Sequence, residues 1–103
     1  MKLIYAIVND EDTNRVANAL VKEGFYATKL PSTGSFLKAG NTTFLIATTE
    51  DKVDMAIDVI KSKAKKRKKF VPSTVEKDVE FPVEVNVGGA TIMVTDIERF
   101  EKV

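Results

Sequence analysis

The residues best suited to holding a ligand gather in one polar stretch, residues 28–46, between two apolar segments. The backbone N–H groups around Gly34 could cradle an anion, and the ring of Phe36 offers a face on which a base can stack. The amide of Asn41 can donate and accept hydrogen bonds on a base edge or a sugar. These residue types suit a phosphorylated ligand that carries a ring, although an ordinary β-turn loop with Phe36 and Leu37 in the core would have the same composition.

Most of the residue types that enzymes use for chemistry are missing. The chain has no cysteine and no histidine, which excludes disulfides, thiol chemistry, thiolate metal sites and a histidine base. Gly34 is not followed by the Gly-Lys-Ser/Thr ending of a Walker A loop. The acidic residues 10–12 are explained more simply as the start of a helix than as a metal site. We therefore expect a protein that is not an enzyme and that needs no metal or cofactor.

Length and composition predict a single domain, residues 1–103. A chain of 103 residues with 44% hydrophobic and 30% charged residues can build one modest core. The N-terminal apolar run is too short for a signal peptide. No apolar run approaches the ~20 residues of a membrane span. We expect a cytoplasmic protein without a membrane partner.

Hydrophobic periodicity predicts the order β-α-β-β-α, followed by further strand. The first strand is apolar nearly throughout, which is typical of a central strand. Asp10 suits the cap of the first helix, Gly24 suits its end, and Pro31 is expected to end the next ladder. The expected elements are strand 2–8, helix 10–23, strand 25–30, strand 41–48 and a second helix capped by Thr48 or Thr49.

The C-terminal third predicts a β-hairpin. Residues 83–87 alternate valine with polar side chains, and Gly88-Gly89 fits a two-residue hairpin turn. Pairing this segment with residues 90–94 would gather the apolar side chains on one face. Pro82 suits the beginning of such a strand.

The fold class is predicted to be α+β, a ferredoxin-like βαββαβ sandwich with a C-terminal hairpin. Two helices can cover only one face of its sheet. The other face still carries apolar side chains, so we expect it to be buried by self-association.

The net charge of +1 hides a strongly basic segment, residues 61–69. This segment holds seven cations in nine residues, whereas the rest of the chain carries nine basic and fifteen acidic residues. Mutual repulsion favours a solvated helix end or loop, and a role in binding a ligand or partner is the alternative. The run contains no aromatic residue on which a base could stack, so nucleic acid is not an expected partner.

The order of residues, beyond their types, points to a family. Residues 28–44 (TKLPSTGSFLKAGNTTF) resemble the signature of the PII-like cyclic-di-AMP receptors. Residues 1–8 (MKLIYAIV) are similar to the first strand of that family, and residues 81–91 (FPVEVNVGGAT) to its closing hairpin. The resemblance runs nearly from end to end and is weakest between about residues 61 and 80.

The resemblance implies a homotrimer that holds cyclic-di-AMP between neighbouring subunits and signals to an unidentified protein target through rearrangement of its loops. It implies polar contacts to an adenine or ribose from Thr28 and Asn41, and apolar contacts to a base from Phe36 and Leu37. Backbone N–H groups at and around Gly34 would bind phosphate. The residues assigned to the ligand are Thr28, Thr33, Gly34, Ser35, Phe36, Leu37 and Asn41, with Gly88 and Gly89 letting the backbone of the adjoining subunit approach.

Two other functions stay open. The first is a PII-like sensor of another adenine nucleotide or phosphorylated metabolite. Tyr26 stands where the family commonly has arginine, Ala47 where glycine is typical, and a glycine- and asparagine-rich stretch is absent before Phe81. Residues 65–69 would then supply the phosphate contacts. The second is an interaction protein that docks its basic 61–69 segment on nucleic acid or an acidic partner, with steep salt dependence.

Overall fold

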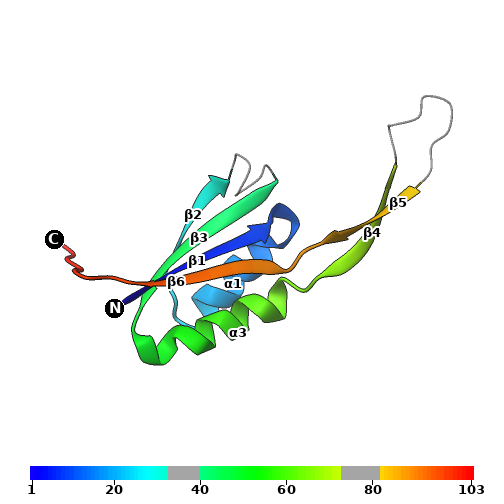
Figure 1. The fold of residues 1–103 in the computed structure, drawn as a ribbon. Helices are drawn as coiled ribbons and strands as arrows, with labels where there is room; N and C mark the ends of the chain where they lie inside the picture. Colours follow the sequence, from blue (N-terminus) through cyan, green and yellow to red (C-terminus); the bar gives the residue numbers. More distant parts are fainter. Residues whose placement is uncertain (33–39, 73–81) are drawn as a thin grey trace.

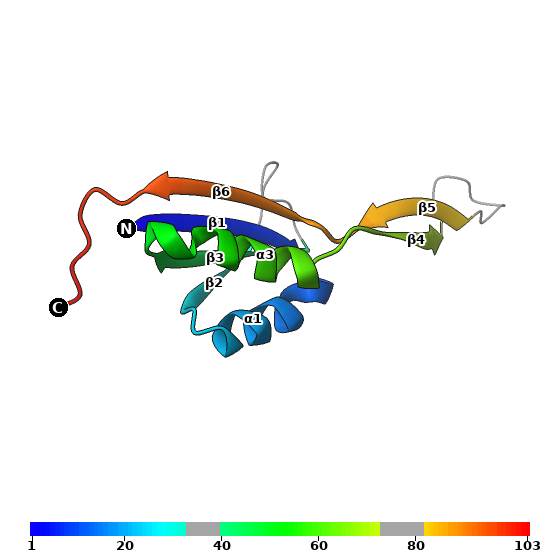
Figure 2. The ribbon, with the colours of Figure 1, turned by 90° about the horizontal axis from the view of Figure 1, so that it is seen from below.

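The structure, a computed structural model, describes residues 1–32, 40–72 and 82–103. Within them, four strands form an antiparallel sheet in the order β2-β3-β1-β6, and two more form a separate ribbon, β4-β5. Helices α1 and α3 lie together on one face of the sheet (Figures 1 and 2). The elements are β1 Lys2–Asn9, α1 Thr13–Lys22, β2 Ala27–Ser32, β3 Asn41–Thr48, α3 Val53–Lys63, β4 Arg67–Pro72, β5 Pro82–Val87 and β6 Ala90–Asp96.

This arrangement confirms the predicted ferredoxin-like α+β fold. Strand β1 is central, as its continuous apolar run predicted, and it pairs with β3 on one edge and β6 on the other. The element that closes the sheet is β6, because β4 and β5 leave the sheet before the chain returns to β1. The β4-β5 ribbon projects from the body (Figures 1 and 2), and we call it the arm.

The core lies between the helices and one face of the sheet. Ile4, Ala6 and Val8 alternate along β1 and are buried against the helices. Phe44 and Ile46 on β3 are opposite Ala6 and Ile4 and are fully buried. The inner faces of the helices contribute Val16, Leu20, Ala56 and Ile60, which are fully buried.

The two helix starts differ in detail from the sequence expectation. A short 3₁₀ turn, Asp10–Asp12, precedes α1, and its cap is Asn9 rather than Asp10. The Asn9 side chain accepts a hydrogen bond from the backbone N–H of Glu11 at 2.9 Å. The cap moved because β1 continues through Asn9, so the first free N–H groups belong to the 3₁₀ turn. A second 3₁₀ turn, Glu50–Lys52, precedes α3, and its cap position is Thr49, one of the two predicted alternatives, without a side-chain cap hydrogen bond. The cap position of α3 itself is Lys52.

Strand β2 begins and ends later than predicted. It spans Ala27–Ser32 instead of residues 25–30, and Pro31 lies inside its ladder opposite Thr42. A proline is tolerated there because β2 is an edge strand, where one side of the backbone needs no partner. Gly24, with φ +86°, ends the first helical segment as predicted, and Phe25 then enters the core before β2 starts.

The predicted C-terminal hairpin is wrong. Residues 83–87 pair with β4, and residues 90–96 pair with β1, so Gly88-Gly89 joins two sheets rather than reversing the chain between two paired strands. The alternating pattern fits either partner, but only β1 lets Ile92 pack against the helix-covered core. Pro82 does begin β5, as predicted.

The basic segment is also more ordered than the expected solvated helix end or loop. Lys61 and Lys63 do lie in the last turn of α3, where cations favour the helix dipole. Arg67, however, opens β4, and its side chain is only 37% exposed. The segment therefore divides into a helix end, a short link and a strand.

The second face of the sheet has no helix over it among the described residues. Leu3 and Tyr5 on β1 and Leu45 on β3 point to this face by strand alternation and are half-buried. Leu30 and Met93 lie on the same face by register and are 43% and 37% exposed. We call these five residues the open face.

We predict that the helix-facing core carries the stability of the domain. Leu20→Ala should lower the free energy of unfolding by about 2–5 kcal/mol, because it removes a fully buried side chain and leaves a cavity. The neighbouring Val21→Ala is the control, since Val21 is 70% exposed and its loss should change stability by about 0.5 kcal/mol or less. Urea denaturation measures both, and equal effects would contradict the core assignment.

Candidate ligand-binding site

Thr28 and Asn41, the two predicted polar contacts that the structure describes, lie on the same face of adjacent strands. Thr28 on β2 is opposite Leu45 on β3, and Asn41 precedes Leu45 by four residues, so strand alternation puts all three on the open face. At ~3.4 Å per residue, Thr28 and Asn41 are about 14 Å apart along the strands. Thr28 is exposed and Asn41 is half-buried. The two residues could contact different ends of one extended ligand.

The predicted loop residues Thr33, Gly34, Ser35, Phe36 and Leu37 lie outside the described residues. The flanking positions are described: β2 ends at Ser32 and β3 begins at Asn41, and these two residues are paired. The loop therefore starts and ends at one point of the sheet, next to Asn41.

Gly88 and Gly89 lie at the same end of the sheet as Asn41. Asn41 pairs with Asn9 on β1, and the preceding β1 residue, Val8, pairs with Ala90 on β6. Two strand spacings of ~4.8 Å separate β3 from β6. The structure thus brings Asn41 and the two glycines to one end of the sheet, whereas Thr28 lies on the edge strand, level with the middle of β3.

The backbone conformation and the packing of this chain itself require glycine at positions 88 and 89. Both have positive φ, +85° and +75°. A Cβ added at Gly88 would lie 2.4 Å from the Lys65 carbonyl oxygen and 2.6 Å from Arg67 Nη1, and one at Gly89 would lie 2.8 Å from Lys66 Cγ. Only glycine leaves room for residues 65–67 and 88–89 of this chain to pass each other at the base of the arm.

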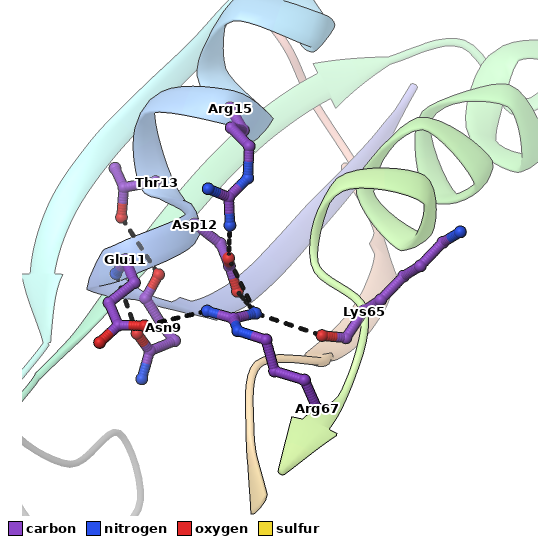
Figure 3. A network of polar contacts seen from close by, with 7 residues as sticks. All are labelled: Asn9, Glu11, Asp12, Thr13, Arg15, Lys65 and Arg67. Carbon is purple, nitrogen blue, oxygen red and sulfur yellow. Dashed lines mark hydrogen bonds and ion pairs between the residues drawn. The ribbon is translucent and has the colours of Figure 1, made fainter. Parts of the chain in front are cut away.

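An ion-pair cluster joins the base of the arm to the start of α1 (Figure 3). Arg67 donates to Glu11 Oε2 at 3.0 Å and to Asp12 Oδ2 at 3.2 Å, and also to the Lys65 carbonyl oxygen at 3.3 Å. Asp12 is fully buried and pairs with Arg15 as well. Hydrogen bonds to Asp12 and Glu11 raise the pKa of Arg67, so this guanidinium stays charged.

This cluster is not predicted from the sequence. Residues 10–12 are typical of a helix start, and Arg67 is one cation of a run that is expected to be solvated. The cluster joins residues about 55 positions apart in the sequence, and no local pattern shows such a pairing. The one available signal was that Arg67 is the only arginine among the lysines of the run, since arginine suits multiple hydrogen bonds to carboxylates.

Two cavities lie near residues that depart from the family or belong to the basic segment. One, of about 360 Å³, is lined by Tyr26 and Ala47 together with Phe25 and Met55. The other, of about 470 Å³, lies between α3 and β6 and combines apolar walls with cations. Its lining includes Ile57, Ile92 and Val94 and the lysines Lys61, Lys65 and Lys66.

No group of three or more acidic side chains in residues 1–32, 40–72 and 82–103 is placed to hold a metal ion. No helix in the described part of the chain is long and apolar enough to cross a membrane. The described residues offer hydrogen-bonding groups on an open sheet face, and the end of β2 and the start of β3 lie beside each other at Ser32 and Asn41.

Comparison with known proteins agrees with this fold. The family model described as cyclic-di-AMP receptor matches residues 1–103, which is the whole chain. The chain belongs to the cyclic-di-AMP receptor family, and the resemblance seen in the sequence is confirmed. The fold is also similar to the crystal structure of a functionally unknown protein from Pediococcus pentosaceus ATCC 25745. The two share 37% sequence identity over 99% of this chain and 96% of that one, with a TM-score of 0.78.

We predict that the crossing at Gly88 is sterically tight. Gly88→Ala combines a left-handed backbone with a contact to the Lys65 carbonyl, whereas Gly24→Ala meets the same φ with nothing within 4 Å. Gly24→Ala should cost about 1–2 kcal/mol of stability, and Gly88→Ala should cost more. Urea denaturation combined with amide exchange in β4 and β5 measures both. Equal costs with unchanged exchange would contradict the crowding.

Proposed function

We propose that this protein is a non-catalytic signalling protein that binds cyclic-di-AMP at the subunit interfaces of a homotrimer and relays binding through its loops. The observation that carries the proposal is the match of the cyclic-di-AMP receptor family over residues 1–103. The position of Thr28 and Asn41 on one open sheet face supports it. The absence of cysteine and histidine is compatible with a receptor in the cytoplasm, and we propose that location for this protein.

Each predicted contact has a distinct role in this proposal. Thr28 and Asn41 bind an adenine or ribose through hydrogen bonds, and Phe36 and Leu37 contact a base. The backbone around Gly34, with the hydroxyl-bearing neighbours Thr33 and Ser35, binds phosphate. Gly88 and Gly89 of the adjoining subunit let that backbone approach the ligand.

The homotrimer is proposed because the sheet has a face that the chain's described part does not cover. Leu3, Tyr5 and Leu45 form a contiguous apolar strip across β1 and β3, extended by Leu30 and Met93. Burying such a strip against other copies removes apolar surface from water, at about 25 cal/mol per Å². The same assembly would place Thr28 and Asn41 beside a neighbouring subunit.

The relay follows from differential affinity. A ligand shifts a loop equilibrium only as far as it binds one loop state better than the other. The loop after β2 carries the base and phosphate contacts, so its conformation would depend on the ligand. An unidentified protein target would then bind one loop state in preference to the other.

A second candidate is a sensor of another adenine nucleotide or phosphorylated metabolite. The specific observation in its favour is the cavity between α3 and β6, where Lys61, Lys65 and Lys66 surround an apolar wall. Arg67 does not strengthen this site, because its guanidinium is bound by Asp12 and Glu11. Docking of the basic segment on an acidic partner is a weaker alternative for the same reason.

We predict micromolar or tighter binding of cyclic-di-AMP, with no comparable binding of ATP or cyclic-di-GMP. Phe36→Ala should weaken binding roughly 5- to 150-fold, which corresponds to the ~1–3 kcal/mol of a stacked base. Asn41→Ala should weaken it about tenfold or more through a lost hydrogen bond. Isothermal titration measures all of these, with Asn18→Ala on the exposed side of α1 as the control. Heat with ATP but not with cyclic-di-AMP would favour the second candidate.

We also predict that the open face holds the trimer together. Tyr5→Glu should reduce the mass measured by light scattering from about three times to once the 11.4 kDa chain, because a carboxylate cannot be buried unpaired. Val21→Glu on exposed α1 is the matched control and should leave the mass unchanged. A monomeric wild-type protein would remove the trimer from the proposal.

A further inference from the structure

The 3₁₀ turn and its cap, residues 9–12, form contacts on two sides, and we call them the acidic turn. One side contacts the beginning of β3, where the candidate ligand residue Asn41 lies. The other side contacts Arg67 at the base of the arm (Figure 3). The acidic turn therefore contacts both β3, which carries Asn41, and the base of the arm.

The contacts toward β3 flank Asn41 on both sides. The backbone N–H of Asp10 donates to the Gly40 carbonyl oxygen at 2.9 Å, and Thr42 Oγ1 donates to Asp10 Oδ1 at 2.7 Å. Asn9 is the β1 residue directly paired with Asn41. A displacement of residues 40–42 would therefore also move Asp10, because a backbone hydrogen bond and a side-chain hydrogen bond connect them.

The contacts toward the arm converge on one side chain. Arg67 is the first residue of β4 and pairs with Val87, the last residue of β5. Its guanidinium reaches Glu11 at 3.0 Å and the fully buried Asp12 at 3.1 Å. Both strands of the arm therefore pass the acidic turn at the point where they leave the body.

The acidic turn is internally braced, so its two sides should move together. Glu11 N–H donates to the Asn9 side chain at 2.9 Å, and Thr13 Oγ1 lies 3.5 Å from the Asn9 carbonyl oxygen. Arg15, in the first turn of α1, pairs with Asp12. The arm, in contrast, is a two-stranded ribbon in its described part, and such ribbons are marginally stable alone. Its direction should therefore depend on the contacts at its base.

We propose that the acidic turn couples the ligand-binding end of β3 to the direction of the arm, with Thr42–Asp10 as the contact on the ligand side and Arg67–Glu11/Asp12 as the contact on the arm side. This inference rests on the proposed function in taking Asn41 as a ligand contact. The state in which Arg67 is bound to the turn is the state that holds Asn41 for ligand. Coupling of this kind is reciprocal: a ligand that steadies the arm must bind less well when the arm is released.

The experiment measures the distance between the arm and the body. Because the chain has no cysteine, Glu84→Cys on β5 and Asp58→Cys on α3 give two unique spin-label positions. Labelled protein is mixed with excess unlabelled protein, so that each assembly carries at most one labelled chain. Double electron–electron resonance then gives the distance distribution with and without cyclic-di-AMP, and titration calorimetry gives the affinity of each variant.

Thr42→Val tests the coupling without touching Arg67 or the proposed ligand residues. It should broaden the distance distribution of the ligand-free arm, and Thr42→Ser, which keeps the hydroxyl, should restore the wild-type distribution. Arg67→Met should broaden it as well and weaken cyclic-di-AMP binding by roughly 5-fold or more, within the usual range of coupling. Lys22→Met, which removes an exposed cation in the last turn of α1, should do neither.

The outcomes separate this inference from the proposed function. If Thr42→Val leaves the distribution as in wild type, the coupling is overturned, whatever the protein binds. If wild type binds no cyclic-di-AMP but Thr42→Val still broadens the distribution and Thr42→Ser restores it, the coupling stands and the proposed ligand is wrong. If Arg67→Met broadens the distribution and leaves the affinity unchanged, the cluster is only a brace for the arm and the coupling to ligand is overturned.

Discussion

Backbone pairing of β1 on both of its edges is the constraint on which the rest of this structure depends. The strand is antiparallel to β3 over all eight residues, and to β6 over seven of them. Double pairing satisfies its buried N–H and C=O groups, which would otherwise be costly to remove from water. It also sets the face of every side chain in the central sheet, with Ile4, Ala6 and Val8 toward the helices. The open face is then defined by the remaining positions.

Much of the fold could be predicted from local sequence because its determinants are local. Apolar alternation, helical spacing and Gly24 at a helix end each act over a few residues, and each of them placed an element correctly. The partner of residues 83–87 could not be found in this way, because alternating valines fit any strand with the same periodicity. Long-range competition decided it: β1 had a second edge to pair, and Ile92 could reach the core only from that edge.

The candidate site divides in a similar way. Strand alternation alone would put Thr28 and Asn41 on one face once the β2-β3 register was known. The family match over the whole chain then supports the ligand class. The Arg67–Asp12 contact was beyond reach, because a charged residue in a basic run is normally solvated and the sequence does not show which lysine or arginine meets a buried carboxylate. Arg67 and Asp12 are about 55 residues apart in the sequence. They meet only once the fold has brought them together, so local sequence does not predict their contact.

At Gly88, the two segments that lead into and out of the arm pass each other. The arm can therefore differ in length without any change in the body of the domain. Both strands of the arm leave through this one point, and the sheet resumes with β6 immediately after it. Residues could be added or removed in matched pairs, two on each strand, without changing which side chains face which way, since strand alternation repeats every two residues. Related chains could therefore carry arms of different reach on an unaltered four-stranded platform. Partner selection would in that case evolve at the tip while the ligand end of the sheet stayed the same.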